Sequence, residues 1–337
     1  MRYGAFLKEH GRIGFVAPSF GCATEPYRTA FDHALKKFDE MGYQTVLGPN
    51  CRAESGIGIS NTPELCAKEL EDYYCADTQD VLISCGGGEL MCEILPHLNF
   101  EKIREAAPKW YMGYSDNTNF TFLLPTICDT AAIYGPCAAS FGMEPWDSSL
   151  QVAFDVLKGE RLTVKGYEKW ELESLKDETH PTVPYNLTEK RVLFGEDARF
   201  SGRLIGGCLD ILTNLVGTAY DRVEEFQDRY KEDGIIWFME ACDLNVFSIR
   251  RALWQMKEAG WFQYAKGFLI GRPRIFDEPM MGLDRHTAVA GILGDLHVPI
   301  IQDLDIGHLP PMIPLICGSV ANVVVTGNDY SIEMKLS

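Results

Sequence analysis

The stretch KWYMGYSDNTNF, residues 109–120, runs from bulky apolar side chains through a glycine and a serine into small polar residues. The apolar run 120–124 that follows is typical of a helix. The pattern predicts a buried strand that turns sharply into a helix, with Ser115 at the corner. Such a corner exposes a hydroxyl and brings backbone N–H groups to a helix N-terminus, as a nucleophilic serine requires. The motif is Gly-x-Ser-x-Asn rather than Gly-x-Ser-x-Gly, so an N-capping Ser115 or Asp116 in an ordinary turn fits as well.

Strands and helices alternate on both sides of this corner, which predicts βαβ units and a mainly parallel sheet. The pattern is lost between 141 and 199, where charged residues, proline and glycine dominate, and it resumes with strands from residue 202 onward. The chain ends in a predicted β-hairpin around Gly327-Asn328-Asp329. The sequence therefore predicts an α/β protein of two domains. These are an N-terminal mainly parallel domain at 1–140, a linker with a long insertion loop at 141–199, and a C-terminal α/β domain rich in strands at 200–337.

The composition excludes several classes of protein. The 337 residues carry a formal net charge of −17, which argues against nucleic acid or an anionic membrane surface as partner. Eleven cysteines are scattered without any C-x-x-C pair, which indicates reduced thiols rather than disulfides or a zinc site. No apolar stretch is long enough to span a membrane, and the first residues do not resemble a signal peptide. We expect a soluble, cytoplasmic protein.

A glycine loop could complete an acyl-transfer site with Ser115. Gly86, Gly87 and Gly88 follow an apolar strand, and glycines there allow bare backbone N–H groups to approach an oxyanion or a phosphate. The loop lacks the signatures of a P-loop and of a dinucleotide-binding fold. A simple turn without a ligand explains the glycines equally well.

A carboxylate and a histidine that could activate a serine lie in the second half of the chain. Glu240 ends a strongly apolar strand, where active-site residues gather in α/β sheets, although a salt-bridged structural glutamate is an alternative. Among the seven histidines, His308 is the best placed to act as the base. It follows an apolar run and lies between a glycine and two prolines. Asp303, Asp305 and His308 could instead bind a metal, but two carboxylates and one histidine in a single loop are few ligands for a metal site. We therefore expect no metal.

Trp170 lies in the polar segment 141–199. An aromatic residue in such surroundings either anchors the loop or offers a stacking platform to a ligand. Segments of this length inside a compact protein are often lids or binding loops.

The ordered set of motifs resembles the L,D-carboxypeptidase family of serine peptidases, which includes the microcin C immunity peptidases. The resemblance rests on 13–19, 85–88, 113–118, 202–207, Glu240 and 305–308, and it spans about residues 10 to 327. It implies a two-domain homodimer without metal or organic cofactor.

The resemblance also implies roles for individual residues. Ser115 would be the nucleophile, His308 the general base and acid, and Glu240 the group that orients His308. The N–H groups of Gly87 and Asp116 would form the oxyanion hole.

Two branches of the family differ in substrate. One trims the terminal D-residue from cytoplasmic murein tetrapeptides, and the other cleaves an amide that joins a peptide or amino acid to a nucleotide-like group. The length of 141–199, with Trp170, resembles the second branch and predicts a small peptide or aminoacyl-nucleotide substrate. That branch carries an asparagine at the position of Cys208 and a lysine at that of Leu244, both near the nucleotide. These two departures count against microcin itself as the substrate. The candidate substrate-binding residues are Gly86, Gly88, Trp170 and Cys208.

A non-catalytic protein of the same fold, binding a small anion at the glycine loop, is an alternative of a different class. The loss of hydrolysis in Ser115→Ala with an intact fold would exclude it.

Overall fold

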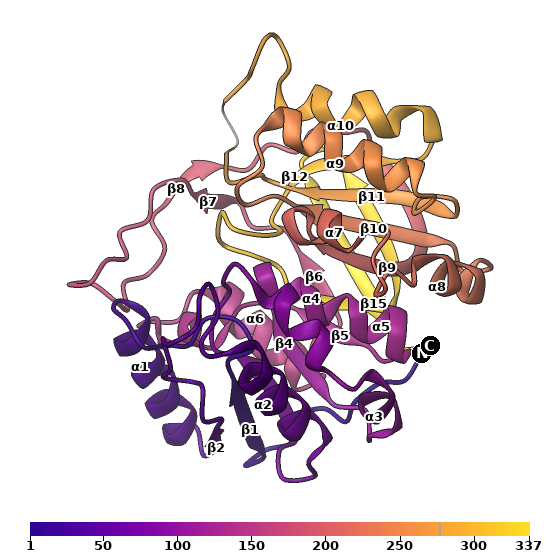
Figure 1. The fold of residues 1–337 in the computed structure, drawn as a ribbon. Coiled ribbons are helices and arrows are strands. Elements are labelled where there is room, and N and C mark those ends of the chain that lie inside the picture. The colour runs from indigo at the N-terminus through magenta and orange to yellow at the C-terminus, as the bar shows by residue number, and fades with distance from the viewer. Residues whose placement is uncertain (276–277) are drawn as a thin grey trace. The chain divides into compact units, whose positions relative to one another are not determined.

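The computed structural model describes residues 1–275 and 278–337. The chain divides into two compact units, each built around its own sheet (Figure 1). The first unit comprises Met1–Arg161 and Glu173–Asn186, and the second comprises Leu162–Leu172 and Leu187–Ser337. The segment 141–199 therefore contributes to both units.

The sheet of the first unit is parallel, as the alternation of strands and helices predicted. Its strands are ordered β5-β4-β3-β1-β2, and β4, which leads to Ser115, lies inside the sheet between β3 and β5. The strand bounds are β1 Arg12–Val16, β2 Gln44–Leu47, β3 Val81–Ser84, β4 Trp110–Gly113 and β5 Ala132–Tyr134.

The helices of the first unit begin and end where their residues dictate. In α1 the buried residues Ala30, Phe31, Ala34 and Phe38 form one apolar face. The hydroxyl of Thr62 accepts a hydrogen bond from the N–H of Leu65 and caps α2. The bounds are α1 Tyr27–Glu40, α2 Pro63–Cys75, α3 Phe100–Glu105, α4 Thr118–Thr121, α5 Leu123–Cys128 and α6 Ser148–Leu157, with 3₁₀ turns at Met91–His97, Ser115–Asn117 and Ala138–Gly142.

The sheet of the second unit is mixed, with strand order β12-β11-β10-β9-β14-β15-β6. Strands β9 to β12 run parallel, whereas β14, β15 and β6 are antiparallel to their neighbours. A short antiparallel pair, β7–β8, stands apart from this sheet. The bounds are β6 Thr163–Lys165, β7 Lys169–Glu171, β8 Leu187–Lys190, β9 Ala198–Cys208, β10 Ile235–Glu240, β11 Ala265–Gly271, β12 Ile300–Leu304, β14 Val320–Thr326 and β15 Asp329–Lys335. A further short strand of this unit, β13 Leu315–Cys317, belongs neither to the mixed sheet nor to the β7–β8 pair.

Helices α7, α9 and α10 pack on the β10–β11 part of this sheet (Figure 1). Asn245 caps α9 by accepting a hydrogen bond from the N–H of Ser248, and Asp284 and Thr287 form a capping box that starts α10. The bounds are α7 Leu209–Leu215, α8 Val223–Tyr230, α9 Val246–Glu258 and α10 Arg285–Leu293, with a 3₁₀ turn at Gly294–Leu296.

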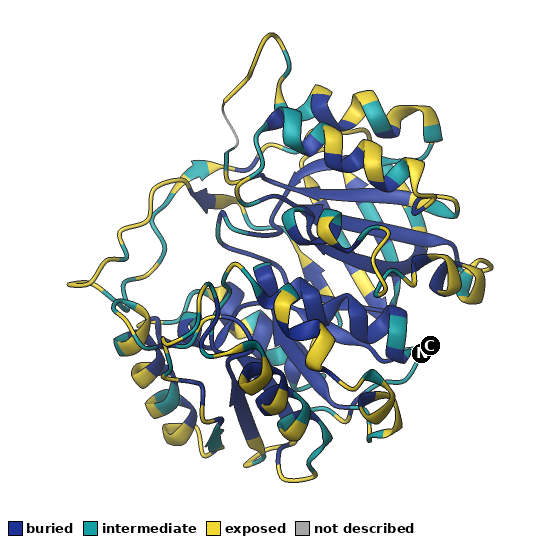
Figure 2. Ribbon diagram, in the orientation of Figure 1, coloured by how far each residue is buried: buried dark blue, intermediate teal, exposed yellow. Residues whose placement is uncertain are grey.

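Strands β4 and β10 are buried along their whole length (Figure 2). Every residue of β4 and of β10 is buried, because helices or loops cover both faces of a parallel sheet. Ser115 follows β4 and Glu240 ends β10, so the buried core of each unit fixes the position of its candidate residue.

The predicted tail hairpin is confirmed, since β14 and β15 pair antiparallel across Gly327 and Asn328. Helix α6 inside the segment 141–199 and helix α8 after α7 were not expected from the sequence, and neither was the short helix α3. Asp147 caps α6 by accepting a hydrogen bond from the N–H of Ser149 at 2.8 Å. Within the part of the chain that the structure describes, no helix combines the length and the apolarity needed to cross a bilayer.

Candidate active site

Ser115 occupies a strained corner directly after β4. Its φ angle is +63°, in the left-handed region that a residue with a Cβ rarely adopts. The residue begins a 3₁₀ turn whose N-cap is Tyr114, so Ser115 is not itself an N-cap. Its backbone N–H donates to the hydroxyl of Tyr134 at 3.2 Å. The structure therefore has the sharp strand-to-helix turn that an exposed nucleophile needs.

The glycine loop lies against this corner. A Cβ atom on Gly87 would stand 3.1 Å from Cβ and 3.3 Å from Oγ of Ser115. Ser84 Oγ donates to the carbonyl of Gly86 at 3.0 Å, and Asn117 Nδ2 donates to the same carbonyl at 2.8 Å. The loop and the elbow are thus held together, with the backbone of Gly87 beside the serine hydroxyl.

The carboxylate of Asp116 is buried beneath the elbow rather than exposed beside Ser115. Asp116 is 1% exposed, and burial raises the pKa of its carboxyl to about 6. Its Oδ2 accepts hydrogen bonds from Ser19 Oγ at 2.5 Å and from the N–H of Met91 at 2.9 Å. The side chain anchors the turn, which leaves the backbone N–H of Asp116 as its candidate contribution to an oxyanion hole.

Glu240 and His308 form a pair within the second unit. His308 Nδ1 lies 2.8 Å from Glu240 Oε2, and the Glu240 side chain is fully buried. A Cβ atom on Gly307 would stand 2.4 Å from Glu240 Oε2, so the chain passes close over the carboxylate just before His308. An imidazole held through Nδ1 by a carboxylate presents Nε2 for proton transfer.

The surroundings of His308 favour its charged form. Burial alone would lower the pKa of His308, but the charge of Glu240 and hydrogen bonds with Cys242 and Glu240 together raise that pKa well above its ordinary value. Cys242 lies two residues beyond Glu240, and its own N–H donates to Asp210 Oδ2 at 3.0 Å.

Asp303 and Asp305 accept hydrogen bonds from arginine side chains. They were the carboxylates of the possible metal site with His308. Asp303 accepts from Arg285 at 3.0 and 3.1 Å and contacts His286 Nε2 at 2.6 Å. Asp305 accepts from Arg272 Nη2 at 2.6 Å. Two carboxylates neutralised in this way are poor ligands for a cation.

Trp170 and Cys208 are both buried in the second unit. Trp170 is 5% exposed on β7, its Nε1 donates to the carbonyl of Lys190 on β8, and the guanidinium of Arg272 lies 5.0 Å from its ring centre. These contacts favour the anchoring role over the stacking platform. Cys208 is 1% exposed at the end of β9, with its thiol 3.4 Å from Asp210 Oδ2. Burial, together with the charges of Glu240 and Asp210, raises the pKa of the Cys208 thiol well above its ordinary value.

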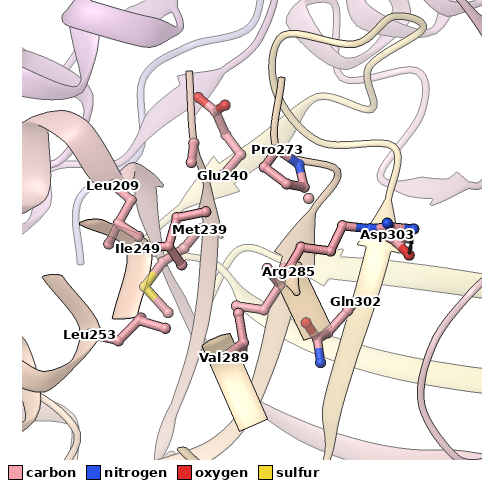
Figure 3. A pocket seen from close by; sticks show the side chains of 13 residues that line it. Leu209, Met239, Glu240, Ile249, Leu253, Pro273, Arg285, Val289, Gln302 and Asp303 are labelled. Carbon is pink, nitrogen blue, oxygen red and sulfur yellow. Dashed lines mark hydrogen bonds and ion pairs between the residues drawn. The ribbon is translucent and has the colours of Figure 1, made fainter. Parts of the chain in front are cut away.

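A pocket adjoins Glu240 inside the second unit (Figure 3). The Glu240 carboxylate points away from Leu253 and Val289, which lie at the opposite end of the pocket (Figure 3). Arg285 crosses it toward Asp303. The apolar lining residues come from helices α7, α9 and α10, from strands β10 and β11, and from the loops that follow these strands: Leu209, Met239, Ala241, Ile249, Leu253, Ile270, Pro273 and Val289.

Three side chains that shape these sites were not singled out from the sequence. Ser19 and Asn117 bind the elbow and the glycine loop, and Cys242 contacts His308. Ser19 follows β1 at its carboxyl end, where polar residues gather in parallel sheets, and that position was the available signal. The contact of Cys242 depends on how the loop after β10 folds, which its sequence does not reveal.

Comparison with known proteins defines the class and the family. The model of the LD-carboxypeptidase N-terminal domain matches residues 13–135, and that of the C-terminal domain matches residues 201–323. The protein is a hydrolase of the serine carboxypeptidase class. It belongs to the LD-carboxypeptidase family.

Individual relatives come from both branches of that family. The chain is 25% identical to the microcin C7 self-immunity protein MccF of Escherichia coli, over 96% of this chain and 94% of that protein. It is 26% identical to a probable murein peptide carboxypeptidase of Bacillus subtilis, over 98% and 94%.

Solved structures of MccF and of an MccF-like protein share the fold. An MccF-like protein from Bacillus anthracis superposes with a TM-score of 0.84 at 21% identity, over all of both chains. MccF in complex with aspartyl sulfamoyl adenosine superposes with a TM-score of 0.83 at 22% identity, over 98% of both.

Proposed function

We propose that this protein is a microcin-immunity-like serine carboxypeptidase or amidase with a Ser115–His308–Glu240 triad. It cleaves the amide at the C-terminal end of a small peptide or an aminoacyl-nucleotide conjugate. The observation that carries the proposal is the 2.8 Å contact between His308 Nδ1 and the buried Glu240. A carboxylate in this place holds the imidazole in one tautomer and stabilises the imidazolium that forms during acyl transfer.

The proposed reaction proceeds through an acyl-enzyme. His308 Nε2 takes the hydroxyl proton as Ser115 Oγ attacks the amide carbonyl, and the N–H groups of Gly87 and Asp116 receive the charge on the tetrahedral oxygen. His308 then gives the proton to the departing nitrogen. Water, deprotonated by the same histidine, attacks the acyl-enzyme and releases the acid.

The assignment to the nucleotide-conjugate branch rests on the long segment 141–199 and on the similarity to MccF over 96% of this chain. Trp170 is buried and its ring is packed against Arg272, so it does not support stacking on a nucleobase. The nucleotide end must then be held by other residues of this chain.

Murein tetrapeptides are the second candidate substrate. Cys208 and Leu244 favour it, because the polar residues of the nucleotide branch are absent at both positions. The similarity to the murein peptide carboxypeptidase of Bacillus subtilis, at 26% identity, supports the same alternative.

The test incubates the purified protein with aspartyl sulfamoyl adenosine and, separately, with a muramyl L,D-tetrapeptide, and follows products by mass spectrometry. Release of aspartate that disappears in Ser115→Ala supports the proposal. Release of D-alanine alone replaces it with the murein function. Hydrolysis of neither compound, or hydrolysis that persists in Ser115→Ala, overturns it.

By the same resemblance we propose a homodimer that acts in the cytoplasm. Analytical ultracentrifugation of the full chain should give twice the mass of 37.8 kDa. A monomer at micromolar concentration would contradict the homodimer. Recovery of the protein outside the cytoplasmic fraction would contradict the cytoplasmic location.

A further inference from the structure

The dipeptide Ser19-Phe20 touches both loops that carry the proposed oxyanion donors. Ser19 Oγ donates to Asp116 Oδ2 at 2.5 Å, and the N–H of Phe20 donates to the carbonyl of Gly87 at 2.8 Å. Ser19 is itself fully buried, and its carbonyl accepts from the N–H of Ser60 at 2.7 Å. Two adjacent residues after β1 therefore connect the elbow to the glycine loop.

The carboxylate of Asp116 is held on both of its oxygens. Besides Ser19, the N–H of Met91 donates to Oδ2 at 2.9 Å, and Asn119 Nδ2 donates to Oδ1 at 3.0 Å. Burial and the charge of Glu89 raise the pKa of Asp116, while these hydrogen bonds hold the rise to about 6. The group is thus mostly ionised at neutral pH and accepts each of these bonds.

The glycine loop packs so closely against Ser19 and Phe20 that position 88 has room only for glycine. A Cβ atom on Gly88 would stand 2.1 Å from Ser19 Oγ and 3.1 Å from the nitrogen of Phe20. The Phe20 bond to the Gly87 carbonyl holds the peptide plane that follows Gly87, next to the plane that carries the Gly87 N–H. Because the elbow is strained at Ser115, surrounding contacts must hold it in place.

We infer that Ser19 is a positioning residue for acyl transfer, which sets the spacing between the backbone donors of Gly87 and Asp116. The inference rests on the proposed function of Ser115. Ser19 does not touch the substrate. It acts through the buried Asp116 carboxylate and, through the Phe20 N–H, on the glycine loop.

The matched control is Ser149→Ala. Ser149 is also buried, at 2% exposure, and its Oγ donates to the Asp147 carboxylate at 2.6 Å on α6, so the substitution removes the same kind of bond elsewhere in the first unit. Asp116→Asn is a second variant, which keeps the side-chain shape and removes the charge that the Ser19 hydroxyl meets.

The experiment measures labelling of Ser115 by a fluorophosphonate probe, with thermal unfolding of each variant alongside. Labelling forms a bond between Oγ and phosphorus and breaks the phosphorus–fluorine bond; the hydroxyl proton passes to His308 and fluoride leaves. The reaction needs the oxyanion donors but no knowledge of the natural substrate. Loss of one donor costs about 100- to 1000-fold in acyl transfer, so misplacement should cost less, about tenfold. We expect Ser19→Ala and Asp116→Asn to slow labelling about tenfold, and Ser149→Ala to change it less than twofold at a similar loss of Tm.

The outcomes separate the two proposals. Wild-type labelling at Ser115 that is unchanged in Ser19→Ala overturns the positioning role and leaves the proposed nucleophile in place. Equal slowing in Ser19→Ala and Ser149→Ala also overturns it, because the effect would then follow stability. A wild-type protein that is not labelled at Ser115 overturns both.

Discussion

The Nδ1 atom of His308 lies 2.8 Å from Oε2 of Glu240, a residue 2% exposed at the carboxyl end of β10. This carboxylate contributes to the raised pKa of His308, and a base must be neutral to accept a proton. Activity should therefore rise with pH, with a midpoint above the ordinary histidine value of about 6.5.

Glu240→Gln should lower kcat/KM by about 10³- to 10⁴-fold, since a triad without its carboxylate loses tautomer control. It should also move the acid midpoint of the pH profile to lower pH, because the charge that favours imidazolium is gone. The measurement is kcat/KM from pH 5 to 9 for both proteins. A midpoint that stays in place would show that Glu240 does not act on the titrating group.

The left-handed backbone conformation of Ser115 should lower the free energy of unfolding, and substitution by glycine should restore it. At a φ of +63°, a residue with a Cβ is strained by about 1 kcal/mol, whereas glycine is not. Ser115→Gly and Ser115→Ala should both be inactive, and the glycine variant should have the higher free energy of unfolding by about 1 kcal/mol. Urea unfolding measures the difference. Equal stabilities would mean that the elbow is relaxed in solution.

Gly87→Ala should impair catalysis with little effect on stability. The added Cβ would meet the Ser115 side chain at 3.1 to 3.3 Å, so the serine must shift by tenths of an ångström. Misplaced reacting groups are costly, and we expect kcat to fall at least about tenfold. Gly135→Ala is the control, because its Cβ would find ordinary contacts from 3.4 Å outward. Comparable losses of kcat in both variants would contradict the prediction.

Glu69 should make stability fall as the solution becomes neutral. Burial raises the pKa of Glu69 to about 7, against the hydrogen bonds that its carboxylate accepts from the N–H groups of Ala17 and Asn50. The folded state then holds its proton more tightly than the unfolded state, so stability is lost as pH rises from about 4.5 to 7.

From pH 5 to 8 this loss should amount to about 2 to 3 kcal/mol. Glu69→Gln does not titrate, so the variant's free energy of unfolding relative to wild type should improve by that amount over the same range. Urea titrations at both pH values test it. A pH-independent difference between the two proteins would rule out a titrating Glu69.

Local sequence patterns were sufficient for most elements of the fold. The continuous apolar run of β10 and the alternation around β4 predicted buried parallel strands, which the structure confirms. Helix α6 lies in a segment whose charge and proline content do not indicate a helix. Its Leu150, Ala153, Phe154 and Leu157 do lie on one buried helical face. Helix α8 has few apolar residues, and its short pattern is weak.

The sequence by itself determined the α/β alternation, the turn at Ser115 and the identity of the candidate residues, because these depend on neighbours within a few positions. Only the tertiary structure decided which side chains meet. Glu240 and His308 are 68 residues apart and pair because the loop after β12 passes over the end of β10. Trp170 on β7 lies beneath the guanidinium of Arg272, which follows β11 and is about 100 positions away in the chain. Such contacts follow from the order of strands in a sheet, and no local pattern encodes that order.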